Sequence, residues 1–153
     1  MDIVYYWKNH AADVKAGRLG SFKTTPARLA ALADGYPDFL WAFKPAAGRK
    51  GDVQLIARLR WVDKSTAKTK GEAGQACMYY DPHSEQSITY ADSGSDTAIA
   101  QTTQWVATHF PKMLTGTFPG TAGQEGLRGA ALTELQMLAS HYGAQPFMSP
   151  VEA

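Results

Sequence analysis

Polar and apolar residues alternate along residues 53–62 more regularly than anywhere else in the chain. Because successive side chains of a strand point to opposite faces, this alternation predicts a β-strand with one core face and one largely polar face. The core face would carry Val53, Leu55, Ala57, Leu59 and Trp61. The polar face would carry Gln54, Ile56, Arg58, Arg60 and Val62.

Four further segments are rich in β-branched and aromatic residues, which favours strands over residues 3–7, 39–44, 77–81 and 86–91. The Gly-containing segment 45–52 predicts a hairpin that leads into the strand at 53–62. The segment Pro82-His83-Ser84-Glu85 predicts a turn that would join the last two strands as a second hairpin.

Helix signals lie between and after these strands. Thr25 is a capping residue followed by Pro26, which suits the first helical position. Thr133 and Gln136 form a capping-box pair at the start of the last helix. Residues 115–129 are rich in Gly and Thr and predict a loop, and the tail to residue 153 is expected to be irregular. The predicted helices cover residues 10–16, 25–35, 97–110 and 133–142.

The polar connections between consecutive strands favour antiparallel pairing. We therefore expect an α+β fold, a small, mainly antiparallel β-barrel or curved sheet with flanking helices. A chain of 153 residues is most simply one domain. Residues 1–91 would form the barrel-like core, and residues 92–153 would add C-terminal helices that pack on it.

The charge of the chain is divided between its two halves. Residues 1–70 carry 13 Lys and Arg against 6 Asp and Glu, whereas residues 71–153 carry 2 against 8. The net charge of +1 hides this division. A one-sided positive field attracts polyanions such as nucleic acid, although folding can also bring the halves together and cancel part of the field.

Several functional classes find no support in the sequence. No apolar run is long enough for a transmembrane helix, the first residues lack the features of a secretory signal, and Cys77 has no second cysteine to pair with. We therefore expect a cytoplasmic protein that does not bind membranes. Zinc-ligand spacing, a phosphate-binding loop and a nucleophile elbow are all missing, so we expect no metal, no cofactor and no catalytic residue set.

Cations of the first half are placed to contact a nucleic-acid backbone. Arg58 and Arg60 would connect two basic loops at opposite ends of a strand that is about 33 Å long. Such an arrangement favours a stripe that follows a phosphate backbone over one compact pocket. The candidate nucleic-acid-binding residues are Lys15, Arg18, Lys23, Arg28, Arg49, Lys50, Arg58 and Arg60.

Aromatic side chains are interleaved with these cations, as is typical of proteins that stack on nucleic-acid bases. In the adjacent pairs Tyr5-Tyr6 and Tyr79-Tyr80, the two rings must face opposite sides of a strand. If the core takes one ring of a pair, the other lies on the opposite face. The candidate base-stacking residues are Tyr5, Trp7, Tyr79 and Tyr80.

The order of these elements resembles the PUA-like superfamily, in particular its EVE and ASCH type modules. The resemblance covers residues 1–91. It implies a compact β-barrel with flanking helices that reads RNA or modified DNA bases, and the chain has no nuclease motif that would let it cut them. The residues that carry it are Trp7 at the end of the first strand, Lys15-Ala16-Gly17-Arg18, the capped helix Thr25–Gly35, Trp41, and Gly51-Asp52 before the long strand.

Three functions remain open. The first is a nucleic-acid-binding module, in particular a reader of modified bases, which would lose affinity when Arg58 and Arg60 are changed to Ala. The second is a protein-interaction or inhibitor protein, such as an adaptor, a phage-type counter-defence factor or a homodimer. That protein would work through acidic residues near Tyr79 or Tyr80, namely Asp81, Glu85, Asp92 and Asp96.

The third function is a small amidohydrolase that acts on modified nucleosides. Some ASCH-type proteins are thought to hydrolyse such compounds with Lys, Thr and Glu. Lys23, Thr24 and Thr25 resemble the first two members of that set. The basic half contains no Glu, and Glu72 and Glu85 are the nearest in sequence.

Overall fold

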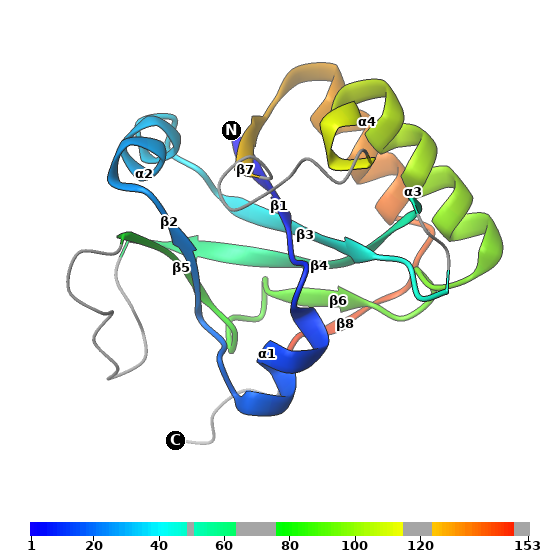
Figure 1. Cartoon of the computed structure of the whole chain (residues 1–153), viewed down its shortest axis with the longest axis horizontal. Helices are drawn as coiled ribbons and strands as arrows, with labels where there is room; N and C mark the ends of the chain where they lie inside the picture. Colours follow the sequence, from blue (N-terminus) through cyan, green and yellow to red (C-terminus); the bar gives the residue numbers. More distant parts are fainter. Residues whose placement is uncertain (49–50, 64–75, 115–123, 149–153) are drawn as a thin grey trace.

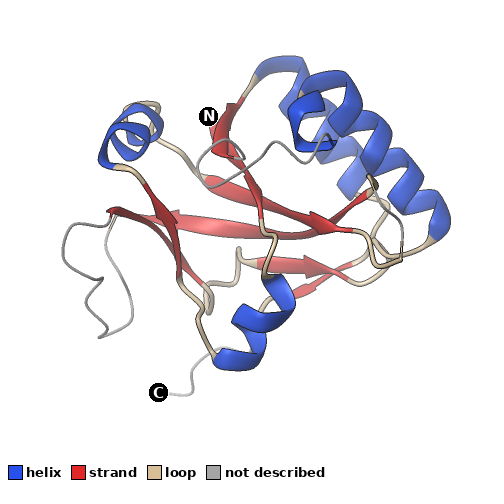
Figure 2. Cartoon of the chain, viewed as in Figure 1, coloured by secondary structure: helices blue, strands red, loops and turns tan. Residues whose placement is uncertain are grey.

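A strongly curled mixed sheet forms the centre of the molecule (Figures 1 and 2). The computed structural model describes residues 1–48, 51–63, 76–114 and 124–148, and eight strands of this part of the chain pair into the sheet. They are β1 (Asp2–Tyr6), β2 (Ser21–Thr24), β3 (Phe39–Pro45), β4 (Val53–Val62), β5 (Ala76–Asp81), β6 (Ile88–Tyr90), β7 (Gln124–Leu127) and β8 (Ala144–Pro146).

The strands follow the order β2-β5-β4-β3-β1-β7, and β6 and β8 extend the sheet beside β4. The pair β1–β3 is parallel, and the other described pairs are antiparallel. The predicted α+β fold with a mainly antiparallel curved sheet and flanking helices is confirmed. The helices are α1 (His10–Ala16), α2 (Pro26–Ala33), α3 (Asp96–His109) and α4 (Gly129–Ala139), with a short 3₁₀ turn at Pro111–Leu114.

The first two helices lie within two residues of their predicted bounds, 10–16 and 25–35. Gly17 ends α1 in the left-handed region, at φ 72°, where glycine avoids the steric cost of a side chain. Thr25 caps α2, because its hydroxyl oxygen accepts a hydrogen bond from the Arg28 amide at 3.2 Å, and Pro26 follows it. These two helices flank β2, so α1 and α2 lie at its opposite ends (Figure 1).

A β-bulge divides β4 between two hydrophobic clusters. Phe43 pairs with Leu55 whereas Ala42 pairs with Ala57, so Ile56 is the extra residue. Val53 and Leu55 therefore face a different cluster from Ala57, Leu59 and Trp61. The prediction of one continuous core face along residues 53–62 is wrong, although the bounds of the strand are confirmed.

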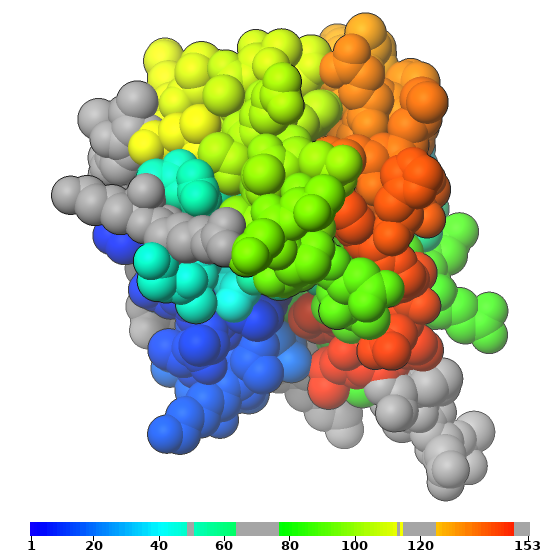
Figure 3. All heavy atoms as spheres, turned by 90° about the vertical axis from the view of Figure 1, so that its right-hand side faces the viewer, coloured from blue at the N-terminus to red at the C-terminus, as the bar shows by residue number. Residues whose placement is uncertain are grey.

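The two clusters lie on opposite faces of the sheet. The inner cluster lies in the hollow of the curl and includes Phe22 of β2, Leu40 of β3 and Leu32 of α2. The outer cluster lies on the convex face and includes Phe43, together with Trp105 of α3 and Leu135 of α4. The helices α3 and α4 cover this face, and Figure 3 shows them side by side.

The segments β5 and β6 do not form a hairpin. Both run antiparallel to the same edge of β4, one after the other, so the predicted pairing between them is wrong. Residues 82–87 interrupt the ladder between β5 and β6, and the Ser87 side chain supplies hydrogen bonds within this interruption. Its hydroxyl oxygen accepts a hydrogen bond from the Arg60 amide at 2.9 Å and donates to the Asp81 carbonyl at 2.5 Å.

Residues after position 91 contribute strands as well as helices. β7 pairs with β1 at one edge of the sheet, and β8 pairs with β6. The prediction of a loop is thus wrong for residues 124–127, and that of an irregular tail is wrong for residues 144–146. Within the described ranges, no helix is both long enough and apolar enough to cross a membrane.

Candidate functional site

A cleft with a volume of about 680 Å³ opens between β1, α1 and β2. The chain leaves β1, turns through α1, and returns along β2, which pairs with β5 and not with β1 (Figure 1). The walls of the cleft come from both arms of this turn. They consist of Tyr5, Asn9, Asp13, Gly17, Arg18, Leu19, Ser21, Phe22 and Lys23.

Two aromatic rings form the apolar wall of the cleft. Tyr5 of β1 stacks on Phe22 of β2, with ring centroids 3.8 Å apart and an angle of 17° between the ring planes. The edge of Trp7 meets Phe22 from the inner cluster, with centroids 4.9 Å apart. Because the curl of the sheet brings β1 and β2 together here, this stacked pair fixes the width of the cleft.

A carboxylate is held in place beside the aromatic wall. Asp13 Oδ2 accepts a hydrogen bond from Trp7 Nε1 at 2.8 Å, and Asp13 Oδ1 accepts one from Arg18 Nε at 3.1 Å. The second contact is also an ion pair, and 65% of the Arg18 side chain stays exposed. The guanidinium is thus oriented by Asp13 while much of it still faces solvent.

The hydroxyl groups near the cleft remain protonated at neutral pH. Burial, together with the nearby charge of Asp13, raises the pKa of Tyr5 to about 12. Burial also raises the pKa of Tyr80. Tyr5 can therefore donate a hydrogen bond from a neutral phenol to a ligand in the cleft.

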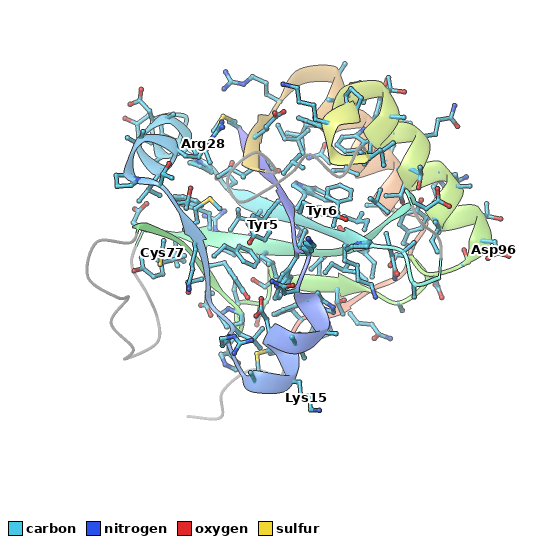
Figure 4. The ribbon with its side chains drawn as sticks, viewed as in Figure 1. Tyr5, Tyr6, Lys15, Arg28, Cys77 and Asp96 are labelled. Atoms are coloured by element: carbon cyan, nitrogen blue, oxygen red, sulfur yellow. The ribbon has the colours of Figure 1, made fainter. Side chains whose placement is uncertain are left out.

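The structure brings together some of the predicted cations. Arg18 and Lys23 both line the cleft. Lys15 is exposed on α1 and points away from the body of the molecule (Figure 4). Arg28 is half-buried on α2, at the other end of β2. Arg49 and Lys50 lie outside the described residues.

Arg58 and Arg60 lie on the opposite face of the sheet from the cleft. They alternate with Ala57, Leu59 and Trp61, which belong to the inner cluster, so their side chains lie on the outer face. Their guanidinium groups lie over the Phe39 ring, 4.2 Å and 5.5 Å from its centroid for Arg58 and Arg60, respectively. The predicted stripe is therefore divided between two faces of the molecule.

The predicted stacking residues also have different positions. Tyr5 lines the cleft, whereas Tyr79 is half-buried and alternates with Tyr80 of the inner cluster. Trp7 and Tyr80 are 1% and 0% exposed, so other protein groups cover their rings. We therefore assign Trp7 and Tyr80 to the support of the cleft and Tyr5 to its accessible wall.

Three polar residues of the described cleft lining, Asn9, Asp13 and Ser21, were not predicted as site residues. Asn9 lies just before α1, and Asp13 lies four positions later on α1. This spacing places them on one side of a helix. Asn9 stands at the N-terminal cap position of α1, but its side chain makes no capping hydrogen bond. The sequence signal for Asn9 and Asp13 was their spacing, which places both side chains on one side of a helix that ends just before Arg18.

The four acidic residues predicted as an interaction surface, Asp81, Glu85, Asp92 and Asp96, do not line this cleft. Asp81 ends β5, and its Oδ1 accepts a hydrogen bond from the His83 amide at 2.9 Å, which stabilises the following turn. Glu85 and Asp92 are exposed in connecting segments, and Asp96 is in the first turn of α3. Among the described residues, no group of three His, Cys, Asp or Glu side chains is arranged to hold a metal ion.

No protein-family model, curated protein or solved structure matches this chain. The resemblance to the PUA-like superfamily stays a prediction. The residues of the cleft are therefore the features of this chain that point to a function.

Proposed function

We propose that this protein binds nucleic acid and holds one unpaired base in the cleft between β1 and β2. The observation that carries this proposal is the position of two cations, Arg18 and Lys23, beside the stacked rings of Tyr5 and Phe22. Aromatic rings bind bases of any sequence by stacking, and neighbouring cations bind the phosphates. The arrangement thus supports contact with both parts of a nucleotide.

The polar groups of the cleft suit recognition of a base edge. Asn9 offers both a donor and an acceptor, and the Tyr5 hydroxyl offers a donor. Asp13 is anchored by Trp7 and Arg18, and anchored side chains recognise a ligand with little loss of entropy. The resemblance to PUA-like modules supports the narrower proposal that the base is a modified one.

The dimensions of the cleft favour a single nucleotide over a duplex. Its volume of about 680 Å³ lies within the range of roughly 300–1,000 Å³ that is common for small-ligand sites. A base inside a duplex would first have to be extruded, which costs a few kcal/mol, whereas a single strand avoids this cost. We therefore expect single strands to bind more tightly than duplexes of the same sequence.

Binding is a better account of the cleft than hydrolysis. Lys23 lines the cleft, but Thr24 and Thr25 are not part of its lining. The described lining also contains no Glu, the third member of the set expected for an ASCH-type amidohydrolase. The anchored Asp13 already accepts two hydrogen bonds, a role that suits positioning more than proton transfer.

Fluorescence anisotropy of labelled single-stranded DNA, RNA and duplex DNA tests the proposal. We expect affinity to fall with salt, because each phosphate neutralised on a single strand makes the slope of log K against log salt concentration more negative by about 0.7. Arg18→Gln and Lys23→Gln should each weaken binding and reduce that slope. The absence of binding at low salt would refute the proposal.

Arg128→Gln is the matched control, because it removes the same charge from an exposed residue outside the cleft lining. It should leave affinity within about twofold of the wild type, the range of an exposed-charge effect of a few tenths of a kcal/mol. The double variant Arg58→Ala/Arg60→Ala should also retain binding, since both residues lie on the other face of the sheet. A larger loss in this double variant than in the cleft variants would instead favour the stripe on the outer face.

A further inference from the structure

A second cavity lies on the outer face of the sheet, apart from the cleft. This cavity has a volume of about 220 Å³ and lies between Arg58 of β4 and the last turn of α4. Trp41, Ile88 and Tyr90 supply its apolar and aromatic walls, and Gln136 and Ser140 supply polar groups from α4 and its C-terminal cap. The proposed binding of nucleic acid in the cleft does not involve this cavity.

Within the part of the chain that the structure describes, the guanidinium of Arg58 has no anionic partner. Arg60, two positions along the same face, pairs with Asp38 at 3.5 Å, but no described carboxylate forms an ion pair with Arg58. Arg58 Nε is buried without a hydrogen-bond partner, and Arg58 Nη2 makes only a long contact of 3.4 Å with the Gln86 carbonyl. Unpaired buried donors are rare in folded proteins, because their desolvation is not compensated.

The walls of the cavity suit an apolar ligand body. The rings of Trp41 and Tyr90 are nearly parallel, with 10° between their planes. Protein groups cover most of both rings, and the part that stays uncovered lines the cavity. Trp41 Nε1 already donates to Asp2 Oδ2 at 2.8 Å, so Trp41 offers the cavity an apolar ring. Burial raises the pKa of Tyr90 to about 12, so its phenol keeps its proton and can donate to an anion.

We propose that this cavity binds a small organic carboxylate, with its anionic group on Arg58 and its apolar body against Trp41 and Tyr90. One unpaired cation matches one negative charge. The C-terminal end of α4 adds the partial negative charge of its carbonyl groups, which disfavours a ligand with two negative charges. A monocarboxylate therefore fits better than a phosphate monoester.

Titration of the protein with sodium benzoate, followed by the indole N–H signals of the tryptophans in NMR spectra, tests this proposal. Benzoate should shift the signal of Trp41 in a saturable manner and leave that of Trp7, beside the cleft, unchanged. Benzyl alcohol, which lacks the charge, and phenyl phosphate, which carries more of it, should both bind more weakly. A Trp41 signal that benzoate does not shift, or equal binding of benzyl alcohol, would overturn the proposal.

Arg58→Gln and Arg60→Gln form a matched pair of variants, since both remove one cation from the same face of β4. Arg58→Gln should lower benzoate affinity about tenfold or more, as expected for loss of a charged hydrogen bond. Arg60 does not line the cavity, so Arg60→Gln should keep the wild-type affinity. Unchanged affinity in Arg58→Gln would refute the role of Arg58, and the ligand comparison in the wild type decides the question if that variant does not fold.

Discussion

At the scale of single residues, a buried carboxylate connects the first strand to the third. Asp2 is 4% exposed, and its Oδ2 accepts a hydrogen bond from Trp41 Nε1. Burial raises the pKa of Asp2, and the hydrogen bond from Trp41 opposes this rise only in part. The folded state therefore favours the protonated form of Asp2 more than the unfolded state does.

This shift predicts a pH dependence of stability. The contribution of Asp2 is fully present below its unfolded pKa of about 3.8 and is lost as the pH rises through the higher folded pKa. Asp2→Asn keeps an oxygen acceptor for Trp41 and removes the titration. The free energy of unfolding of Asp2→Asn, relative to the wild type, should thus increase between pH 3.5 and pH 7.

Urea unfolding of both proteins at several pH values in this window measures the difference. Because the two proteins differ in one titrating group, the other carboxylates cancel in the comparison. A difference that stays constant with pH would mean that Asp2 has the same pKa in both states. A difference that decreases would reverse the sign of the shift.

The sequence predicted residue types better than residue positions. Alternation required Tyr5 and Tyr6 to face opposite sides, and they do: Tyr5 packs against the inner cluster and Tyr6 against the outer one. Which ring would face the hollow depends on the direction of the curl, and that direction is set by strand pairing far along the chain. The hydrogen bond between Asp13 and Trp7 could not be predicted for the same reason, because the inner cluster fixes the position of the Trp7 ring.

At the scale of elements, the strands were predicted where their own residues specify them. The bounds of β4 follow from the run of alternating residues 53–62. The bulge at Ile56 did not follow, because an apolar residue suits either face when both faces are buried. β7 was missed because its sequence, Gln-Glu-Gly-Leu, lacks β-branched and aromatic residues and pairing with β1 stabilises it.

Ser87 offers a test of how the sheet tolerates the interruption between β5 and β6. Ser87→Ala removes the acceptor for the Arg60 amide and the donor to the Asp81 carbonyl, in a fully buried position. An unsatisfied buried polar group costs about 1–3 kcal/mol, so the free energy of unfolding should fall by about this amount. Equilibrium urea unfolding measures it.

Ser84→Ala serves as the control for this variant. Ser84 lies in the same connection, and its hydroxyl accepts only an exposed hydrogen bond from the Gln86 amide at 3.2 Å. Its loss should cost less than about 0.5 kcal/mol. Equal effects of the two substitutions would show that Ser87 does not hold the ladder together.

At the scale of the whole molecule, the division of charge along the sequence is not a division between two surfaces. The basic half supplies Arg18 and Lys23 to the cleft, but it also places Arg58 and Arg60 on the outer face. Strand alternation predicted correctly that the two arginines share a face. It did not predict that this face would be the convex one, because the curl of the sheet depends on the pairing of all the strands.

The central claim is that a base stacks against the cleft wall formed by Tyr5, and the neighbouring Tyr6 provides the sharpest control. Both tyrosines belong to β1, but Tyr5 lines the cleft and Tyr6 packs against the outer cluster. Leucine keeps an apolar side chain at either position and removes the aromatic face. Stacking of a base on an aromatic ring contributes about 1–3 kcal/mol.

The decisive measurement is therefore the affinity of one labelled single-stranded oligonucleotide for the wild type, Tyr5→Leu and Tyr6→Leu, at a single low salt concentration. We predict that Tyr5→Leu binds at least about fivefold more weakly, which corresponds to the lower end of the stacking energy. Tyr6→Leu should bind within about twofold of the wild type. Equal affinities of the two variants, or a greater loss in Tyr6→Leu, would contradict the placement of the base in the cleft.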